Sequence, residues 1–278
     1  MIIGKVKKLT LGASAALVTM YSSAYATTIS VGVAPSFAEA LIDLSGAFQE
    51  YYITHGNLNY NVVVTVDSTA NLKSEIINGA PSGPYDLLLS PDNLALYDLA
   101  LKQPSLVVGQ PFQYATDSLM LYSKSVDISA GLPSSLTQDF VIADPLKDAY
   151  GRATAQVLAT TPGIVTALRQ NHIKTRDDIG TTFAAVDGGS YPYGFVAKSQ
   201  ICQYNNGSEY YVEGTYHHEY SPTNSAHPYI PISLKGLKIA VTRATDKETE
   251  LTDFVNFLTG QGATVGTSLI KQYCYKAS

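Results

Sequence analysis

Apolar and polar positions follow two different periods in turn along this chain. Short alternating or β-branched runs, typical of strands, are followed by segments with an apolar residue every three or four positions, typical of helices. The predicted strands are 28–33, 61–66, 85–89, 117–123, 140–143, 193–197 and 229–241. The predicted helices begin at Ser36 and after Asp92, and span 70–78, 151–159, 179–186 and 248–258. Alternating strands and helices predict an α/β fold with a mainly parallel sheet.

Two helix starts have the spacing of a capping box, in which a hydroxyl residue precedes an acidic residue by three positions. The pairs are Ser36 with Glu39, and Thr175 with Asp178. We therefore expect the first hydroxyl of each pair to cap its helix. The Tyr-, Asn-, Ser- and His-rich segment 203–228 has no clean period, and we expect a long surface loop or hairpin there.

The first 26 residues have the three parts of a secretory signal. Three lysines precede a short apolar run at 9–20, and Ala-Tyr-Ala at 24–26 has the pattern of a cleavage site. The apolar run is too short to cross a bilayer comfortably. We expect export to the periplasm, with the mature protein beginning near Thr27.

The composition suits a folded protein and argues against a nucleic-acid partner. The 278 residues are 45% hydrophobic and 15% charged, with a net charge of −5. Removing the signal leaves 15 basic against 23 acidic residues, a net charge of −8. The basic residues are scattered, so no surface for nucleic acid is predicted. An acidic protein that binds an anion must do so with local dipoles and hydrogen bonds.

The chain has two cysteines, Cys202 and Cys274. In an oxidising compartment such a pair usually forms a disulfide. The alternative is two unrelated buried thiols. We expect a disulfide that ties a late loop to the C-terminal helix and has no part in chemistry.

Four turns between a predicted strand and a predicted helix carry small or hydroxyl residues, at 34–36, 67–69, 144–151 and 175–179. The first N–H groups of a helix lack intrahelical partners and carry partial positive charge, so they accept anions. In parallel sheets such turns gather at the carboxyl ends of the strands. The four turns together predict a site for an anion. Each turn alone is weak evidence, because hydroxyl residues that cap helices are common.

Several segments, in this order and spacing, resemble the periplasmic molybdate-binding proteins of ABC transporters over nearly the whole mature chain. The matching segments are Ala-Pro-Ser-Phe at 34–37, Ser-Thr-Ala-Asn-Leu at 68–72, Asn-Gly-Ala-Pro at 78–81, Asp-Leu-Leu-Leu-Ser-Pro-Asp at 86–92, Asp-Ser-Leu at 117–119, Ile-Ala-Asp-Pro at 142–145 with Tyr-Gly at 150–151, and Tyr-Gly-Phe-Val at 193–196. The resemblance implies two α/β lobes joined by crossing strands, in the manner of class II periplasmic solute-binding proteins. Lobe 1 would contain 27–115 and 232–278, and lobe 2 would contain 116–231.

The resemblance also implies an oxyanion, molybdate or tungstate, held between the lobes by hydroxyls and backbone N–H groups. The implied ligand-binding residues are Ser36, Ser68, Thr69, Tyr150 and Ile179, the last two through their backbone. The family has a tyrosine donor where this chain has Ala197, and Tyr193 is a candidate to replace it. The expected partners are the anion and a membrane permease. We expect a monomer with no cofactor, no bound metal and no enzyme activity.

Three alternatives stay open. Phosphate or sulfate could take the place of molybdate, with Asp67 as an acceptor for a protonated anion. Ferric iron could bind Tyr210 and Tyr211, with the nearby acidic and histidine residues Glu213, His217, His218 and Glu219 completing the site. A hydrolase or sensor on the same scaffold is the third, but the chain carries no nucleophile-elbow, zinc-protease or phosphate-loop motif.

Overall fold

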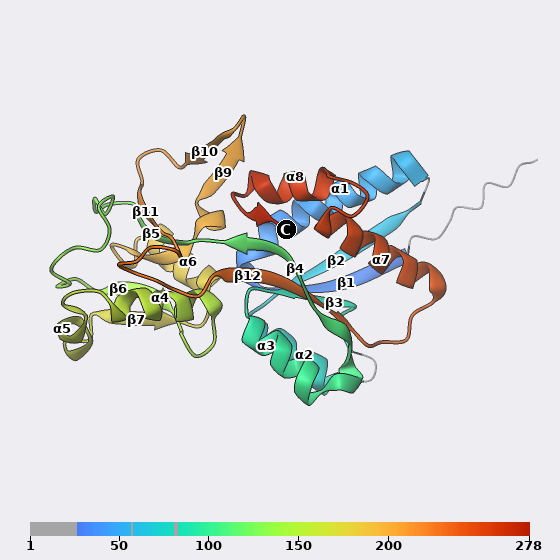
Figure 1. Cartoon of the computed structure of the whole chain (residues 1–278), viewed down its shortest axis with the longest axis horizontal. Helices are drawn as coiled ribbons and strands as arrows, with labels where there is room; N and C mark the ends of the chain where they lie inside the picture. Colours follow the sequence, from blue (N-terminus) through green and yellow to red (C-terminus); the bar gives the residue numbers. More distant parts are fainter. Residues whose placement is uncertain (1–26, 57, 81–82) are drawn as a thin grey trace, which may run out of the picture.

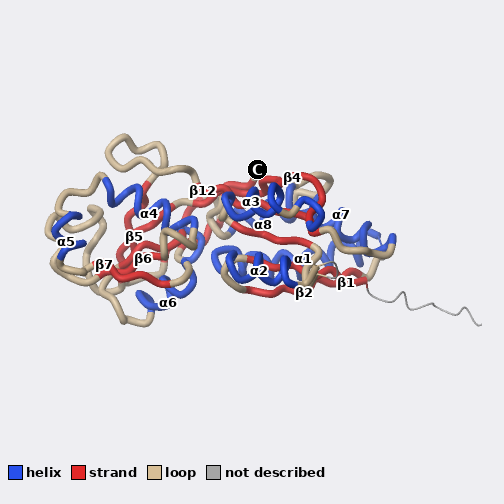
Figure 2. The backbone as a smooth tube through the Cα atoms, turned by 90° about the horizontal axis from the view of Figure 1, so that it is seen from below, coloured by secondary structure: helices blue, strands red, loops and turns tan. Residues whose placement is uncertain are grey.

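The computed structural model describes residues 27–56, 58–80 and 83–278 and has two lobes, each built on its own sheet (Figure 1). The predicted secretory signal at 1–26 and part of the 78–81 turn lie outside the described residues. Viewed from below, the lobes lie side by side along the long axis of the molecule, with β12 near their junction (Figure 2). The predicted two-lobed α/β fold is confirmed, but each sheet mixes parallel and antiparallel pairings and is not mainly parallel as expected.

Lobe 1 contains a six-stranded sheet in the order β13-β4-β12-β3-β1-β2. Its strands are β1 (Thr27–Val33), β2 (Tyr60–Val66), β3 (Leu87–Ser90), β4 (Val107–Asp117), β12 (Ile232–Ile239) and β13 (Lys276–Ala277). Its helices are η1 (Pro35–Phe37), α1 (Ala38–Gly56), α2 (Thr69–Asn78), α3 (Asn93–Lys102), η2 (Pro104–Leu106), α7 (Thr245–Thr259) and α8 (Val265–Gln272). β1 pairs in parallel with β2 and β3, whereas β12 runs antiparallel to β3 and β4.

Lobe 2 contains a five-stranded sheet in the order β11-β5-β8-β6-β7. Its strands are β5 (Leu119–Ser123), β6 (Phe140–Ala143), β7 (Ile173–Arg176), β8 (Gly194–Ala197) and β11 (Tyr216–Tyr220). Its helices are α4 (Ala149–Ala159), α5 (Ile164–Arg169), α6 (Ile179–Asp187) and η3 (Lys198–Gln200), and a separate hairpin is formed by β9 (Cys202–Asn205) and β10 (Ser208–Tyr211). Only Ser118 separates β4 in the first sheet from β5 in the second, so the chain crosses between lobes there. The second crossing lies between β11 and β12.

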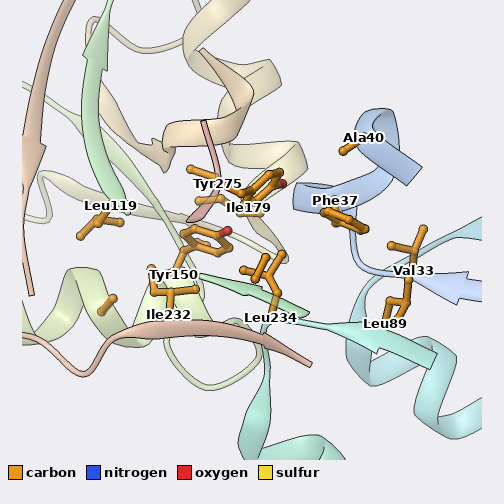
Figure 3. Close-up of a cluster of buried hydrophobic side chains, with 14 of the residues drawn as sticks. Val33, Phe37, Ala40, Leu89, Leu119, Tyr150, Ile179, Ile232, Leu234 and Tyr275 are labelled. Atoms are coloured by element: carbon orange, nitrogen blue, oxygen red, sulfur yellow. The ribbon is translucent and has the colours of Figure 1, made fainter. Parts of the chain in front are cut away.

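A continuous apolar cluster extends from lobe 1 through the junction into lobe 2 (Figure 3). Residues drawn from both lobes, including Phe37, Leu119, Tyr150 and Tyr275, are buried in it. Because these side chains leave water together, the cluster stabilises the observed arrangement of the lobes.

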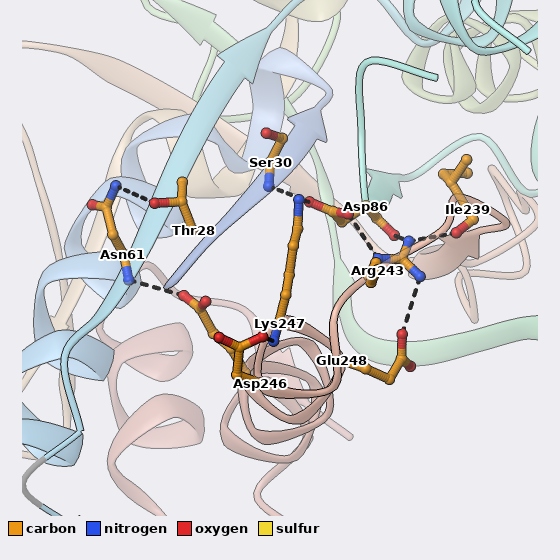
Figure 4. A network of polar contacts seen from close by, with 10 residues as sticks. Thr28, Ser30, Asn61, Asp86, Ile239, Arg243, Asp246, Lys247 and Glu248 are labelled. Carbon is orange, nitrogen blue, oxygen red and sulfur yellow. Dashed lines mark hydrogen bonds and ion pairs between the residues drawn. The ribbon is translucent and has the colours of Figure 1, made fainter. Parts of the chain in front are cut away.

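A buried carboxylate holds three segments of lobe 1 together (Figure 4). Asp86, just before β3, accepts hydrogen bonds from the Ser30 N–H and from Arg243 Nε, both at 2.7 Å, and lies 2.9 Å from Lys247 Nζ. Burial raises the pKa of Asp86, but Ser30, Lys247 and Arg243 outweigh it and bring that pKa below its ordinary value. Asp86 therefore stays ionised and links β1 to the chain that leads into α7.

Two local expectations were wrong, and a third held only in part. Ser36 lies inside η1, where Ala34 is the N-cap without a side-chain bond, because Pro35 takes the first helical position. Thr175 lies in β7, and the capping box of α6 instead joins Asp178 to Thr181. The 203–228 segment contains the expected hairpin, but its later part forms β11 and pairs with β5.

The expected disulfide is present: Cys202 and Cys274 are bonded. Cys202 begins β9, in the hairpin that the chain forms between η3 and β11 of lobe 2, and Cys274 lies between α8 and β13 of lobe 1. The bond is therefore a covalent connection between the lobes in addition to the two chain crossings.

Candidate functional site

The carboxyl ends of the parallel strands of both lobes lead into helix starts. In lobe 1, β1 leads to η1, β2 to α2 and β3 to α3; in lobe 2, β6 leads to α4 and β7 to α6. Helix starts present unpaired N–H groups and partial positive charge. The junction between the lobes is therefore where an anion would meet the most donors.

Ser36 offers an unused hydroxyl at this junction. Its Oγ is buried, with the residue 6% exposed, and makes no hydrogen bond to another described residue. Its carbonyl oxygen accepts a hydrogen bond from the Tyr275 hydroxyl and lies 3.4 Å from Ser199 Oγ. Burial raises the pKa of the Tyr150 hydroxyl well above its usual value and the Ser36 side chain opposes that increase, which places Ser36 beside Tyr150. Ser36 is held by its backbone, and its hydroxyl lies beside that of Tyr150 without a well-formed hydrogen bond to any described residue.

The other lobe 1 candidates surround the start of α2. Ser68 is the N-cap, and its Oγ accepts from the Asn71 N–H at 3.2 Å. Asp67 Oδ1 accepts from the Ser68 N–H and from Asn71, so Asp67 stabilises the same turn. Thr69 is buried, and its hydroxyl shares a 2.7 Å hydrogen bond with Ser90 at the end of β3. Thr69 therefore lies where β2 and β3 both end.

In lobe 2, the backbone donors at Tyr150 and Ile179 converge on one group, the carboxylate of Asp148. Oδ1 accepts from the N–H of Tyr150 at 2.7 Å and of Gly151 at 3.2 Å, and Oδ2 accepts from the N–H of Ile179 at 3.1 Å. Gly151 is needed here, because a Cβ at that position would lie 2.5 Å from the Ala143 carbonyl oxygen. The starts of α4 and α6 are thus close enough to be bridged by a single anionic group.

The Tyr150 side chain belongs to a second, buried polar group at the crossing between lobes. Its hydroxyl donates to Asp117 Oδ2 at 2.6 Å, and Ser199 Oγ donates to the same oxygen at 2.8 Å. Burial raises the pKa of Asp117 to about 6 against the opposing effect of these bonds. Ser199 also reaches the Ser36 carbonyl at 3.4 Å, so this group connects the two lobes.

The start of α6 lies directly against the start of η1. A Cβ added at Gly180 would be only 2.7 Å from the Pro35 Cβ. Figure 3 shows Tyr150, Ile179 and Tyr275 next to one another at the junction. The structure therefore brings Ser36, Tyr150 and Ile179 to one place, with Thr69 at the adjoining strand ends.

Other predicted residues lie elsewhere. Tyr193 precedes β8 and stacks on Phe140 at the beginning of β6, with ring centroids 5.5 Å apart, so its ring is at the opposite end of the lobe 2 sheet. Ala197 ends β8 and has no side-chain donor. Tyr210 and Tyr211 are neighbours on β10 and so point to opposite faces. Tyr211 donates to Glu209 and stacks on His217, and Tyr210 is about half exposed.

Among the histidine, cysteine, aspartate and glutamate residues that the structure describes, no free group of three lies close enough together to hold a metal ion. One group of three lies within mutual reach, Cys202, Glu209 and Cys274, but both sulfur atoms belong to the disulfide. Nor does any helix among the described residues have the length and apolar character needed to cross a membrane.

The sequence reasoning missed the polar residues that organise the junction, which are Asp117, Asp148, Ser199 and Tyr275. Asp148 had a detectable signal, because an aspartate just before a helix is a preferred N-cap. Asp117, Ser199 and Tyr275 come from three distant parts of the chain, and only the tertiary fold brings them together.

A model of the family described as bacterial extracellular solute-binding proteins matches residues 29–265. The chain belongs to this family. Its members are solute-binding proteins, so the interpretation of this chain as a binding protein and not an enzyme is confirmed. In a solute-binding protein, helix starts that face one another across two lobes are a natural position for the solute.

Individual relatives support the predicted resemblance. The molybdate-binding protein ModA of Rhodobacter capsulatus is 26% identical over 192 residues, which cover 68% of this chain and 71% of that protein. The periplasmic molybdate-binding protein of Azotobacter vinelandii has a similar structure, with a TM-score of 0.69, 21% identity, and coverage of 89% of this chain and 98% of that one. The substrate-binding domain of a putative molybdenum ABC transporter from Clostridium difficile gives a TM-score of 0.57 at 19% identity, covering 90% and 99%.

Proposed function

We propose that this solute-binding protein captures a tetrahedral oxyanion, molybdate or tungstate, between its lobes in the periplasm. It then presents the anion to the membrane permease of an ABC transporter. The observation that carries the proposal is the convergence of helix starts from both lobes on a junction that holds a buried, unused Ser36 hydroxyl. Similarity to proteins named as molybdate-binding supports the choice of anion.

The donor set suits an anion that carries no proton. Ser36 and Thr69 supply hydroxyls from lobe 1, while Tyr150 and Ile179 supply backbone N–H groups at helix starts of lobe 2. Molybdate and tungstate are fully ionised at neutral pH and need donors only. Closing the lobes around the anion removes water, and this strengthens each hydrogen bond to it. The bound anion would stabilise the closed form by bridging both lobes.

A titration of the purified mature protein with four anions tests this function. We expect heat release in calorimetry and a raised unfolding temperature with molybdate and tungstate, and weaker responses to sulfate and phosphate. A preference for sulfate or phosphate would contradict the choice of anion. If none of the four anions gave heat or raised the unfolding temperature, the proposal would fail altogether.

A further inference from the structure

The Asp148 carboxylate occupies the donors that the proposed function assigns to the oxyanion in lobe 2. Its bonds to the N–H groups of Tyr150 and Gly151 are those of an ordinary N-cap of α4. Its bond to the Ile179 N–H is different, because Ile179 begins another helix 31 residues further on. Capping of α4 does not require that contact. One carboxylate thus bridges two helix starts, as an oxyanion would.

Asp148 is shielded from solvent and from compensating cations. It is 8% exposed, and no basic side chain in the described part of the chain forms an ion pair with it. Neighbouring Lys147 pairs with Asp177 and Asp144, and Arg152 pairs with Asp92 of lobe 1. The remaining charged neighbour is Asp178 at the start of α6, which repels it.

These surroundings favour the protonated carboxyl. Burial raises the pKa of Asp148 to about 6, three backbone N–H groups oppose that increase, and Asp178 adds to it. A dianion placed beside an ionised Asp148 would add a further, closer negative charge and raise that pKa again. The adjoining Ser36 hydroxyl, buried and unused, is a second and independent sign that a ligand is accommodated at this junction.

We propose that Asp148 couples oxyanion capture to the uptake of one proton. This inference rests on the proposed function. The ionised carboxylate competes with the anion for the N–H groups of Tyr150 and Ile179. When a dianion binds, Asp148 takes a proton from solvent and gives up these donors, and its new O–H can donate to an oxygen of the anion. Asp148 would then determine how tightly the site holds a fully ionised anion at a given pH.

Calorimetric titration with molybdate from pH 6.0 to 8.5, in buffers with different ionisation enthalpies, measures both affinity and proton uptake. Molybdate itself does not titrate in this range, so any proton comes to the protein. We expect proton uptake to approach one proton per anion at pH 8. Near that pH, the affinity for molybdate should then fall by nearly tenfold for each unit by which the pH rises. The wild-type proton count tests the proposal without any variant.

The D148N variant keeps a side-chain oxygen for the N-cap but cannot ionise. We expect its molybdate affinity to be nearly independent of pH and its binding to take up no proton. The matched control is D178N, which removes the neighbouring acid whose carboxylate accepts from the Thr181 N–H and not from the Ile179 N–H. It should retain the wild-type slope at pH 8. Thermal unfolding of both variants verifies that they are folded.

The possible results separate the two proposals. A wild-type protein that binds molybdate with the same affinity from pH 6.0 to 8.5 and takes up no proton would overturn the role of Asp148 and leave the proposed function intact. Equal proton uptake by the wild type and D148N would also overturn it, because another group would then be responsible. Absence of binding by both proteins at every pH would contradict the proposed function itself.

Discussion

Arg152 on α4 lies 2.5 Å from Asp92 at the start of α3, so an ion pair joins lobe 2 to lobe 1. Asp92 is nearly buried, and the same Oδ1 caps α3 by accepting the Ala95 N–H at 3.1 Å. Both partners are partly shielded from water, which makes this pair stronger than an exposed one. It is also a contact that forms only when the lobes are together.

We therefore predict that Arg152→Ala weakens molybdate binding without unfolding the protein. Loss of one charge-assisted contact of about 1–2 kcal/mol should reduce affinity roughly 5- to 30-fold, because the closed form loses stability. Calorimetry measures the affinity, and small-angle scattering should show a larger ligand-free radius of gyration. Lys124→Ala is the control, since Lys124 pairs with Asp187 inside lobe 2 at 3.2 Å. Equal losses in both variants would contradict a specific role for Arg152.

The lobe 1 hydroxyls give a second prediction. Ser36→Ala combined with Thr69→Ala should weaken molybdate binding strongly, because each hydrogen bond to a charged group contributes about 1.5–3 kcal/mol. The fold should tolerate the change, since Ser36 Oγ makes no bond to another described residue and Thr69 Oγ1 bonds only Ser90. Thr249→Ala on the exposed face of α7 provides the control. A double variant that keeps wild-type affinity in calorimetry would mean that the anion binds elsewhere.

The disulfide between Cys202 and Cys274 closes a segment with a sequence separation of 72 and joins the lobes. Replacing both cysteines with serine should lower the free energy of unfolding by about 2–4 kcal/mol, since the unfolded chain becomes less constrained. Chemical denaturation with and without a reductant measures the effect. The reductant should lower the stability of the wild type and leave the variant unchanged. Thiol labelling verifies that the disulfide has been fully reduced. If the reduced wild type then had the same free energy of unfolding as the oxidised protein, the prediction would be contradicted.

The alternating pattern identified most elements of the fold because strands and amphipathic helices have distinct periods. It failed at β4, which contains Gly109 and Pro111 and has no clean alternation. That strand forms because β12 and β13 pair with it on its two sides. Local propensity does not contain this information, since both partners come from the last fifth of the chain.

The candidate site was predictable only in part, for a similar reason. Helix starts can be recognised from local residues, but Ser36, Thr69, Tyr150 and Ile179 were named through the resemblance to molybdate-binding proteins. The contact between Asp148 and the Ile179 N–H depends on how α4 and α6 pack, and sequence spacing does not report it. The same applies to Asp117, whose partners Tyr150 and Ser199 lie 33 and 82 positions away.

Asp117 should make the stability of the protein depend on pH in a direction opposite to that of most carboxylates. Burial raises its pKa to about 6, whereas an aspartate in an unfolded chain titrates near 3.9. Between these values the folded protein binds the proton more tightly than the unfolded chain does. The contribution of Asp117 to stability is therefore greatest below about pH 4 and declines as the pH rises through 6.

The D117N variant isolates this contribution, because the remaining acids titrate in both proteins and largely cancel in the difference. As the pH increases from 4 to 7, the free energy of unfolding of the wild type should fall relative to that of D117N by on the order of 3 kcal/mol. Urea unfolding at four or five pH values measures this difference. If the difference in free energy of unfolding between the two proteins stayed constant from pH 4 to 7, Asp117 would have the same pKa in the folded and unfolded states. The hydrogen bonds from Tyr150 and Ser199 would then fully offset the cost of burying its charge.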